Sequence, residues 1–122
     1  MIDFLFVAVL IGLIYVWWSK RSSVKTVSTG ELKRKISEEQ NIQLLDVREP
    51  QEYRGGHIQQ AKNVPLSGFL RAHAQYPKEK DRPVYVICQS GMRSQRAAVM
   101  LQKAGYTDVY SVKGGMSFWR ES

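Results

Sequence analysis

The sequence predicts an open α/β sheet, mostly parallel, with helices on both faces and one transmembrane helix ahead of it. The sheet is predicted because short apolar runs, bounded by turn residues, alternate with stretches of helical spacing from residue 25 onward. The separate helix is predicted because the chain from Phe4 to Trp18 is apolar on every face and carries no charge. We therefore expect an anchor helix over residues 1–19, a linker over 20–24 and one folded domain over 25–122.

The flanks of the apolar segment predict its orientation. Tyr15, Trp17 and Trp18 lie at its C-terminal end, where amphipathic rings prefer the membrane interface. Lys20, Arg21 and Lys25 follow, and basic flanks remain on the cytoplasmic side of a membrane. We therefore expect a single-pass protein of the cell membrane whose domain faces the cytoplasm. A cleaved signal peptide is disfavoured because no basic region precedes the segment, and an interfacial helix because the segment has no polar face.

The first half of the domain alternates strands and helices. Residues 24–27 alternate weakly and predict a first strand, and Ser28 is a capping residue for a helix that ends near residue 41. The apolar run 42–47 predicts a short buried strand. Pro50 is tolerated in the first turn of a brief helix, which a pair of glycines ends.

The second half repeats this alternation. Residues 62–64 predict a short strand, and the apolar spacing from Leu66 to Ala74 is helical. Residues 84–87 form the most apolar run and predict a central strand. A helix over 95–104, a last strand over 109–112 and a short terminal helix after a second glycine pair complete the domain.

The net charge of +7 raises the question of an anionic partner. The basic residues are scattered among acidic ones, whereas nucleic-acid surfaces concentrate them in a stripe or between aromatic platforms. We therefore expect no nucleic acid, and favour a small anionic substrate or an anionic membrane surface. No histidines or cysteines have metal-ligand spacing, so neither a metal nor another cofactor is expected.

Cys88, the only cysteine, is the leading candidate for a catalytic residue. It follows the predicted strand 84–87 and precedes a glycine-containing loop and a helix N-terminus, whose amides and dipole favour the thiolate. The alternative is an ordinary buried thiol. Four residues separate Cys88 from Arg93, and Gly91 gives this loop the freedom to turn its amides inward around a sulfur-sized anion. Cysteine phosphatases place five residues there, and Arg93 either binds an anionic substrate or braces the loop.

Several segments of the chain carry a family resemblance. In order, they are Leu45-Asp46-Val47-Arg48, Glu52-Tyr53-Arg54-Gly55-Gly56-His57-Ile58, Ala61-Lys62-Asn63-Val64-Pro65, Cys88-Gln89-Ser90-Gly91-Met92-Arg93-Ser94, Gly105-Tyr106 and Lys113-Gly114-Gly115. With these segments the chain resembles a rhodanese domain, of the single-domain sulfurtransferase kind, over about residues 25–121. The resemblance implies a rhodanese-like, doubly wound sheet. It also implies that Cys88 is catalytic, and that the substrate is held by Gln89, Ser90, Gly91, Met92, Arg93 and Ser94.

The resemblance further implies a thiosulfate sulfurtransferase-type enzyme in which Cys88 takes up a sulfane sulfur and becomes a persulfide. The donor would be thiosulfate or a persulfide. Because the chain has no second thiol, the acceptor must be external: cyanide, a small thiol or a cysteine of a partner protein. One alternative is a low-turnover persulfide-binding or scaffold module at the membrane. A phosphatase or arsenate reductase is disfavoured by the loop length and the missing second cysteine.

Other candidate residues have simpler structural explanations. His57 lies in what the resemblance implies is a structural turn, so a general-base role is disfavoured. Asp46 and Arg48 could contact substrate, but an ion pair at a strand end explains them more simply. Phe118 and Trp119 are expected in the core rather than at the rim of a substrate cleft.

Overall fold

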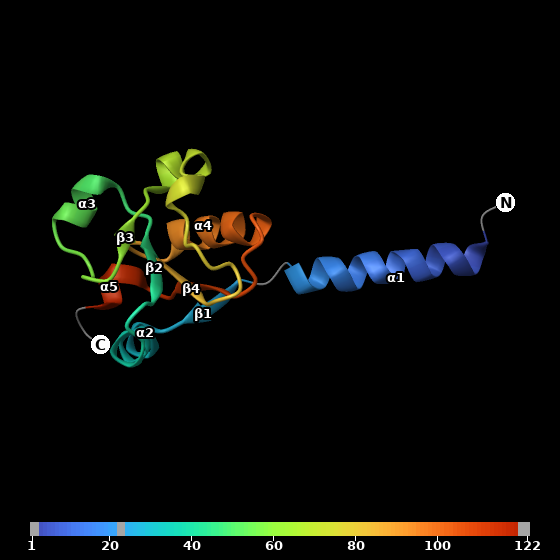
Figure 1. Cartoon of the computed structure of the whole chain (residues 1–122), viewed down its shortest axis with the longest axis horizontal. Helices are drawn as coiled ribbons and strands as arrows, with labels where there is room; N and C mark the ends of the chain where they lie inside the picture. Colours follow the sequence, from blue (N-terminus) through green and yellow to red (C-terminus); the bar gives the residue numbers. More distant parts are fainter. Residues whose placement is uncertain (1–2, 22–23, 120–122) are drawn as a thin grey trace.

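The computed structural model describes residues 3–21 and 24–119 (Figure 1). The predicted linker over 20–24 includes residues 22–23, which lie outside the described residues, as do the last three residues of the predicted domain. The side chains of Trp18, Lys20 and Arg21, on which the predicted orientation in the membrane depends, also lie outside them.

The centre of the domain is a five-stranded parallel sheet with the order β1-β5-β4-β2-β3. Its strands are β1 (Lys25–Val27), β2 (Gln43–Asp46), β3 (Lys62–Asn63), β4 (Val84–Ile87) and β5 (Val109–Val112). The predicted α/β class is confirmed, and 84–87 is the central strand as predicted. The chain leaves β2 toward β3 but leaves the adjacent β4 toward β5, in the opposite direction. Crevices at such reversals of strand order are where open α/β sheets bind ligands.

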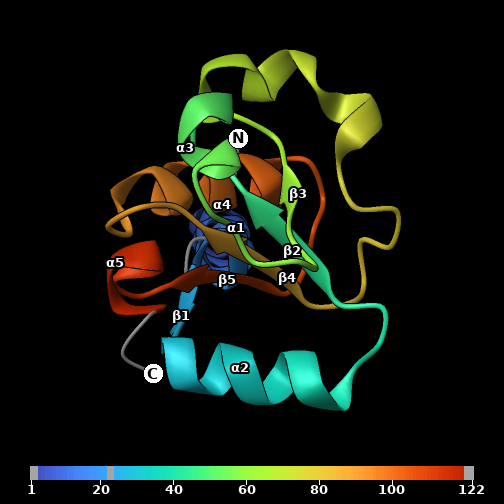
Figure 2. The ribbon, with the colours of Figure 1, turned by 90° about the vertical axis from the view of Figure 1, so that its left-hand side faces the viewer.

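Side chains of alternate residues along β4 enter two separate cores. Val84 and Val86 pack with Ala97, Ala98 and Leu101 on one face of the sheet. Tyr85 and Ile87 pack in a second cluster on the other face, together with Leu32. Figure 2 shows the helices α4 (Met92–Lys103) and α2 (Thr29–Glu38) on opposite sides of the sheet. Cys88, next in this alternation, lies on the α4 side.

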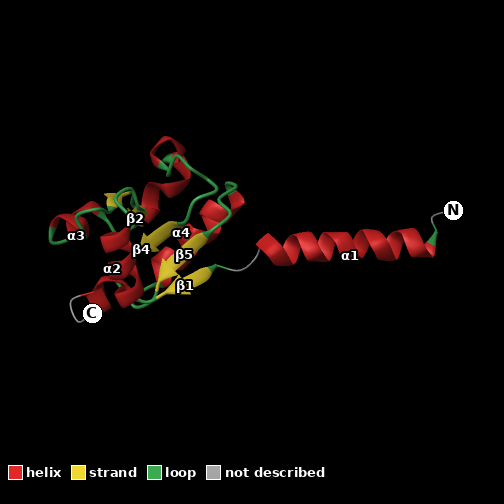
Figure 3. Cartoon of the chain, turned by 60° about the horizontal axis from the view of Figure 1, so that its bottom comes forward, coloured by secondary structure: helices red, strands yellow, loops and turns green. Residues whose placement is uncertain are grey.

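Shorter helices lie between the strands or follow the last one, as the colouring by secondary structure shows in Figure 3. They are α3 (Pro50–Arg54), the 3₁₀ helices η1 (Leu66–Arg71) and η2 (His73–Gln75), and α5 (Gly115–Trp119). The helix expected from Leu66 to Ala74 is therefore two 3₁₀ segments. Helix α4 begins three residues before the predicted start at residue 95, because Gly91 has a φ of 108° and turns the chain straight into the helix.

The apolar N-terminal segment forms α1 (Phe4–Arg21), and its described side chains are exposed from Phe4 to Trp17. In the part of the chain that the structure describes, no helix combines the length and the apolar character needed to cross a membrane. The transmembrane helix predicted over residues 1–19 is therefore not supported. The helix is present, but an 18-residue helix that ends in Lys20 and Arg21 leaves an apolar stretch shorter than a typical bilayer core requires.

Candidate active site

The loop between β4 and α4 holds Cys88 at the carboxyl end of the central strand. The cysteine is fully buried, directly after Ile87. Gly91 closes the loop as the residue before α4, and its positive φ is a conformation that side chains with a Cβ rarely adopt. A β-carbon there would also meet the backbone nitrogen of Gly114 at 3.5 Å. The loop therefore turns tightly around the sulfur.

Polar groups of the loop surround the Cys88 sulfur. The Gly91 amide donates a hydrogen bond to Cys88 Sγ at 3.0 Å, and the Ser94 hydroxyl shares one with it at 3.5 Å. Burial raises the pKa of the Cys88 thiol, but the Ser94 hydroxyl and the amides of Ser94, Gly91 and Ser90 outweigh it, so the net pKa lies below its ordinary value. The site therefore favours a thiolate, the nucleophilic form of cysteine.

A second hydroxyl extends this set behind the loop. Ser94 Oγ lies 2.7 Å from Ser111 Oγ of β5 and donates to the Gly91 carbonyl at 3.0 Å. Both serines are buried. Ser111 is a neighbour of Val86 in the parallel pairing of β4 with β5, which places its hydroxyl close to the end of the strand that carries Cys88.

Arg93 is engaged by α3 instead of pointing free into the loop. Its guanidinium donates two hydrogen bonds to the Glu52 carboxylate, at 2.6 and 2.9 Å. The pair is about one-third exposed. The hydrogen bond from Arg93 lowers the pKa of Glu52 to about 2 from its ordinary 4.5. Of the two roles left open by the sequence, this geometry is that of a brace.

Asp46 and Arg48 form a buried ion pair at the end of β2. The Arg48 guanidinium contacts both Asp46 oxygens, with its Nη2 at 2.9 Å from Oδ2, and also donates to the Gly56 carbonyl at 2.8 Å. It reaches Gln89 Oε1 at 3.4 Å. The predicted structural roles of Asp46 and Arg48 match this arrangement, which connects three segments beside the loop that holds Cys88.

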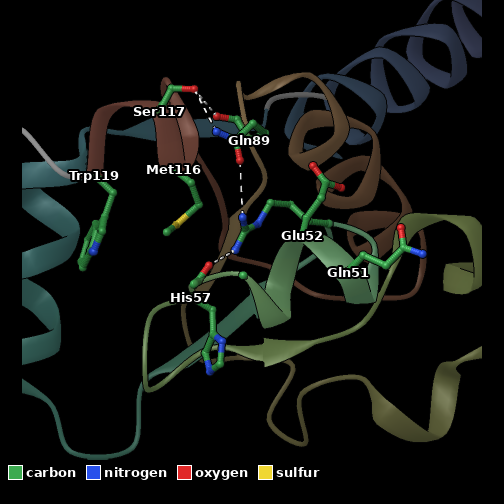
Figure 4. A pocket seen from close by; sticks show the side chains of 10 residues that line it. Gln51, Glu52, His57, Gln89, Met116, Ser117 and Trp119 are labelled. Carbon is green, nitrogen blue, oxygen red and sulfur yellow. Dashed lines mark hydrogen bonds between the residues drawn. The ribbon is translucent and has the colours of Figure 1, made fainter.

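Helix α5 holds the loop from the other side. The amides of Met116 and Ser117 donate to the carbonyls of Cys88 and Gln89, at 2.8 and 3.1 Å. Ser117 Oγ donates to the Gln89 carbonyl at 2.9 Å, and the Gln89 amide group donates to Ser117 Oγ at 3.3 Å (Figure 4). This close approach requires Gly115, whose β-carbon would lie 2.2 Å from the Cys88 carbonyl oxygen.

A cavity of about 580 Å³ lies beside the loop, between α3 and α5. Gln89 lines it together with His57 and Trp119 (Figure 4). His57 is exposed, stacks on Tyr53 and bonds the Tyr53 carbonyl through Nδ1, so its contacts are those of the structural turn that the resemblance implies. Trp119 packs against the core and also borders this cavity. The prediction of a core position is wrong for Phe118, which is 54% exposed.

The predicted substrate-binding residues divide into two groups in the structure. The amides of Ser90, Gly91 and Ser94 and the Ser94 hydroxyl surround the sulfur. The side chains of three others turn elsewhere: Gln89 toward Arg48 and Ser117, Arg93 toward Glu52, and Met92 into solvent, where it is 73% exposed. Substrate binding by these residues stays a prediction.

Comparison with known proteins matches this architecture to one family. The rhodanese-like domain family matches residues 28–122. The chain belongs to the rhodanese-like family. The chain is 38% identical over 101 residues to the thiosulfate sulfurtransferase GlpE of Shewanella oneidensis, covering 83% of this chain and 97% of that protein. It is also 38% identical over 115 residues to the uncharacterized protein YqhL of Bacillus subtilis, covering 94% and 87% of the two chains.

A solved structure gives the same result. The human single-domain sulfurtransferase TSTD1 superposes with a TM-score of 0.71 at 29% identity, covering 82% of this chain and 98% of that one. The relatives named as sulfurtransferases, GlpE and TSTD1, support sulfurtransferase activity in general for this rhodanese-like domain.

Sequence reasoning missed three contributors to the site. Glu52 lies within the family segments, but nothing in its spacing shows that α3 places it against Arg93. Ser111 carried a weak signal, as a hydroxyl in an otherwise apolar strand. The sequence predicts only a turn at Gly115, whereas the structure shows that its missing side chain lets α5 contact the loop.

Proposed function

We propose that this rhodanese-like domain is a sulfurtransferase of the thiosulfate sulfurtransferase type, with Cys88 as its sulfur carrier. The observation that carries the proposal is the buried Cys88 sulfur, with the Gly91 amide 3.0 Å and the Ser94 hydroxyl 3.5 Å away. These donors stabilise a negative sulfur. The relatives named as thiosulfate sulfurtransferases support the donor class.

The reaction has two displacements. In the first, the Cys88 thiolate attacks the outer sulfur of thiosulfate, an S–S bond forms, and sulfite leaves with the electron pair of the broken S–S bond. The charge on the protein passes from the thiolate to the outer persulfide sulfur. In the second, an acceptor such as cyanide attacks that outer sulfur, thiocyanate leaves, and the Cys88 thiolate is restored. Both steps are thiolate displacements, and the second needs an external acceptor because the chain has one cysteine.

The fold restricts the access of substrates to the Cys88 sulfur. The Cys88 side chain is fully covered, whereas Ser90 of the same loop and Met92 at the start of α4 are exposed. We therefore expect donor and acceptor to reach the sulfur through a local displacement of the loop. The natural acceptor, a small thiol or a cysteine of a partner protein, is proposed by its chemistry alone.

The test is thiocyanate formation from thiosulfate and cyanide by the full chain. Cys88→Ala should retain the fold and lose all transfer. Gln95→Ala is a matched control, because Gln95 is an exposed residue of α4 just beyond the loop. Transfer that survives in Cys88→Ala would remove the proposal.

The full burial of Cys88 favours a second candidate, a persulfide-holding or scaffold module with little turnover. The rate at which a preformed persulfide discharges to a thiol separates the two. Fast discharge supports the enzyme, and a persulfide that persists in excess thiol supports the module. Hydrolysis of a phosphate ester would instead revive the phosphatase alternative.

We also propose that α1 holds the domain at a cell membrane, with the domain on the cytoplasmic side. The support is the exposed apolar surface of α1 from Phe4 to Trp17 and the basic residues that follow it in sequence. Cell fractionation tests this location. Recovery with membranes after a high-salt wash supports it, and full recovery in the supernatant contradicts it.

A further inference from the structure

Ser111 is a buried polar residue that the sulfur chemistry described above does not use. It comes from the middle of the last strand and is 1% exposed. Its side chain has one hydrogen-bond partner among the described residues, Ser94 Oγ at 2.7 Å. Ser94 in turn is the side chain that contacts the Cys88 sulfur. The three side chains therefore form a line from the sheet to the sulfur.

Each serine hydroxyl has one proton to donate, and this decides which of Ser111 and Ser94 is the donor in the hydrogen bond between them. If Ser94 donated to Ser111, the Ser111 proton would have no acceptor among the described residues, in a site closed to solvent. A buried donor without a partner is costly, so Ser111 donates and Ser94 accepts. The Ser94 proton is then left for the Gly91 carbonyl at 3.0 Å or for the Cys88 sulfur at 3.5 Å.

This direction favours a negative sulfur. A hydroxyl that accepts from Ser111 is less available to accept from a Cys88 thiol, and it can still donate to a thiolate. A hydrogen bond to a charged acceptor is stronger than one to a neutral carbonyl, so the Ser94 proton turns to the sulfur when the thiolate forms. Donation from Ser111 polarises the Ser94 hydroxyl and strengthens that bond.

We propose that Ser111 is a positioning residue that directs the Ser94 hydroxyl proton toward the Cys88 sulfur. It contacts no substrate and acts through Ser94. Its consequence for sulfur transfer rests on the proposed function, but its effect on the thiol does not.

The charged groups around the loop form ion pairs that do not involve Ser111. Arg93 of α4 is bonded to Glu52 of α3, and Arg48 after β2 is bonded to Asp46. Arg93 interacts electrostatically with Cys88. None of these groups is bonded to Ser111 among the described residues, so a change at Ser111 leaves them in place.

The experiment follows thiolate formation in the full chain by its ultraviolet absorbance as pH is raised. Because Cys88 is the only cysteine, the signal has one source, and Cys88→Ala gives the blank. At pH values below the titration midpoint of Cys88, Ser111→Ala should lower the thiolate fraction by about two- to tenfold, the effect of losing one hydrogen bond. Ser111→Thr and Ser111→Val form a matched pair that differs only in the hydroxyl, and Thr should restore the thiolate where Val does not.

A double variant shows whether Ser111 acts through Ser94. Ser94→Ala alone should lower the thiolate fraction, and adding Ser111→Ala should lower it no further. Equal titrations of Ser111→Ala and the unaltered chain, or full additivity in the double variant, would overturn the proposal. If Ser111→Ala unfolds the chain, the Thr and Val pair decides. Thiocyanate formation, measured separately, reports on the proposed function: its absence with an intact titration effect refutes the enzyme and leaves the Ser111 role standing.

Discussion

Arg93 and Glu52 are joined by two parallel hydrogen bonds, so the second residue of α4, just after the loop that holds Cys88, is tied to α3 across 41 positions of sequence. A fork-to-carboxylate contact of this kind fixes orientation as well as distance. It engages one N–H group of each terminal guanidinium nitrogen. The pair therefore gives the loop its shape, and it suggests a direct test.

Glu52→Gln should weaken the loop without removing any group that contacts the sulfur. We expect a loss of about 1 kcal/mol in the free energy of unfolding, since the pair is partly exposed and screened by solvent. The sign with pH follows from the lowered pKa of Glu52, about 2 instead of 4.5. The contribution is complete above pH 4.5 and is lost as pH falls toward 2, so unaltered chain and variant should converge in acid. Urea unfolding across this range measures it, and a constant difference would contradict the assignment.

Asp46→Ala should be more damaging than any change at a surface ion pair. It leaves the Arg48 guanidinium buried without its partner, which costs about 3–5 kcal/mol. Asp108→Ala is the matched control, because Asp108 pairs with Lys25 at 3.1 Å on the surface. Chemical denaturation of both variants should give a clearly smaller loss for Asp108→Ala, and similar losses would mean that the buried pair contributes little.

Gly115→Ala should disrupt the contact between α5 and the loop. The added carbon would lie 2.2 Å from the Cys88 carbonyl oxygen, at a φ of 56°, so the backbone must move. We expect a loss of about 2 kcal/mol or more in stability together with reduced sulfur transfer. Gly68→Ala is the control, since its β-carbon would meet nothing within 4 Å and its φ is ordinary. Equal behaviour of the two variants would show that the close approach is not needed.

Sulfur uptake should depend on pH through Cys88. Because the loop donors lower its pKa below the ordinary 9.0, the rate of persulfide formation should rise with pH and level off before that value is reached. Single-turnover rates with excess thiosulfate measure this profile. A rate that still rises through pH 9.0 would contradict a stabilised thiolate.

The sequence was sufficient for the elements whose pattern is local. The run 84–87 is apolar without interruption because β4 is covered on both faces, and it is the central strand as predicted. Cys88 was placed correctly at the end of this strand because the break in pattern at Gln89 marks it. The predicted start of α4 is three residues late, since the mostly polar segment from Gln89 to Ser94 is typical of a loop and its pattern does not show that Gly91 turns the chain into the helix.

Contacts between residues far apart in the chain could not be predicted from the sequence. The partners Glu52 and Arg93 lie on different helices, and Ser94 and Ser111 are brought together by the pairing of β4 with β5. Hydropathy likewise could not decide whether α1 spans a membrane, and the predicted span is not supported. Composition describes a segment, whereas these features depend on what lies beside it.

The most direct test of the account is the intact mass of the full chain after incubation with thiosulfate alone. We predict the gain of a single sulfur atom, confined to the peptide that contains Cys88 and released by cyanide as one equivalent of thiocyanate. The Gln95→Ala variant should gain the same sulfur, and Cys88→Ala should gain none. An unchanged mass in the unaltered chain, or a sulfur that remains in Cys88→Ala, would contradict the role assigned to Cys88.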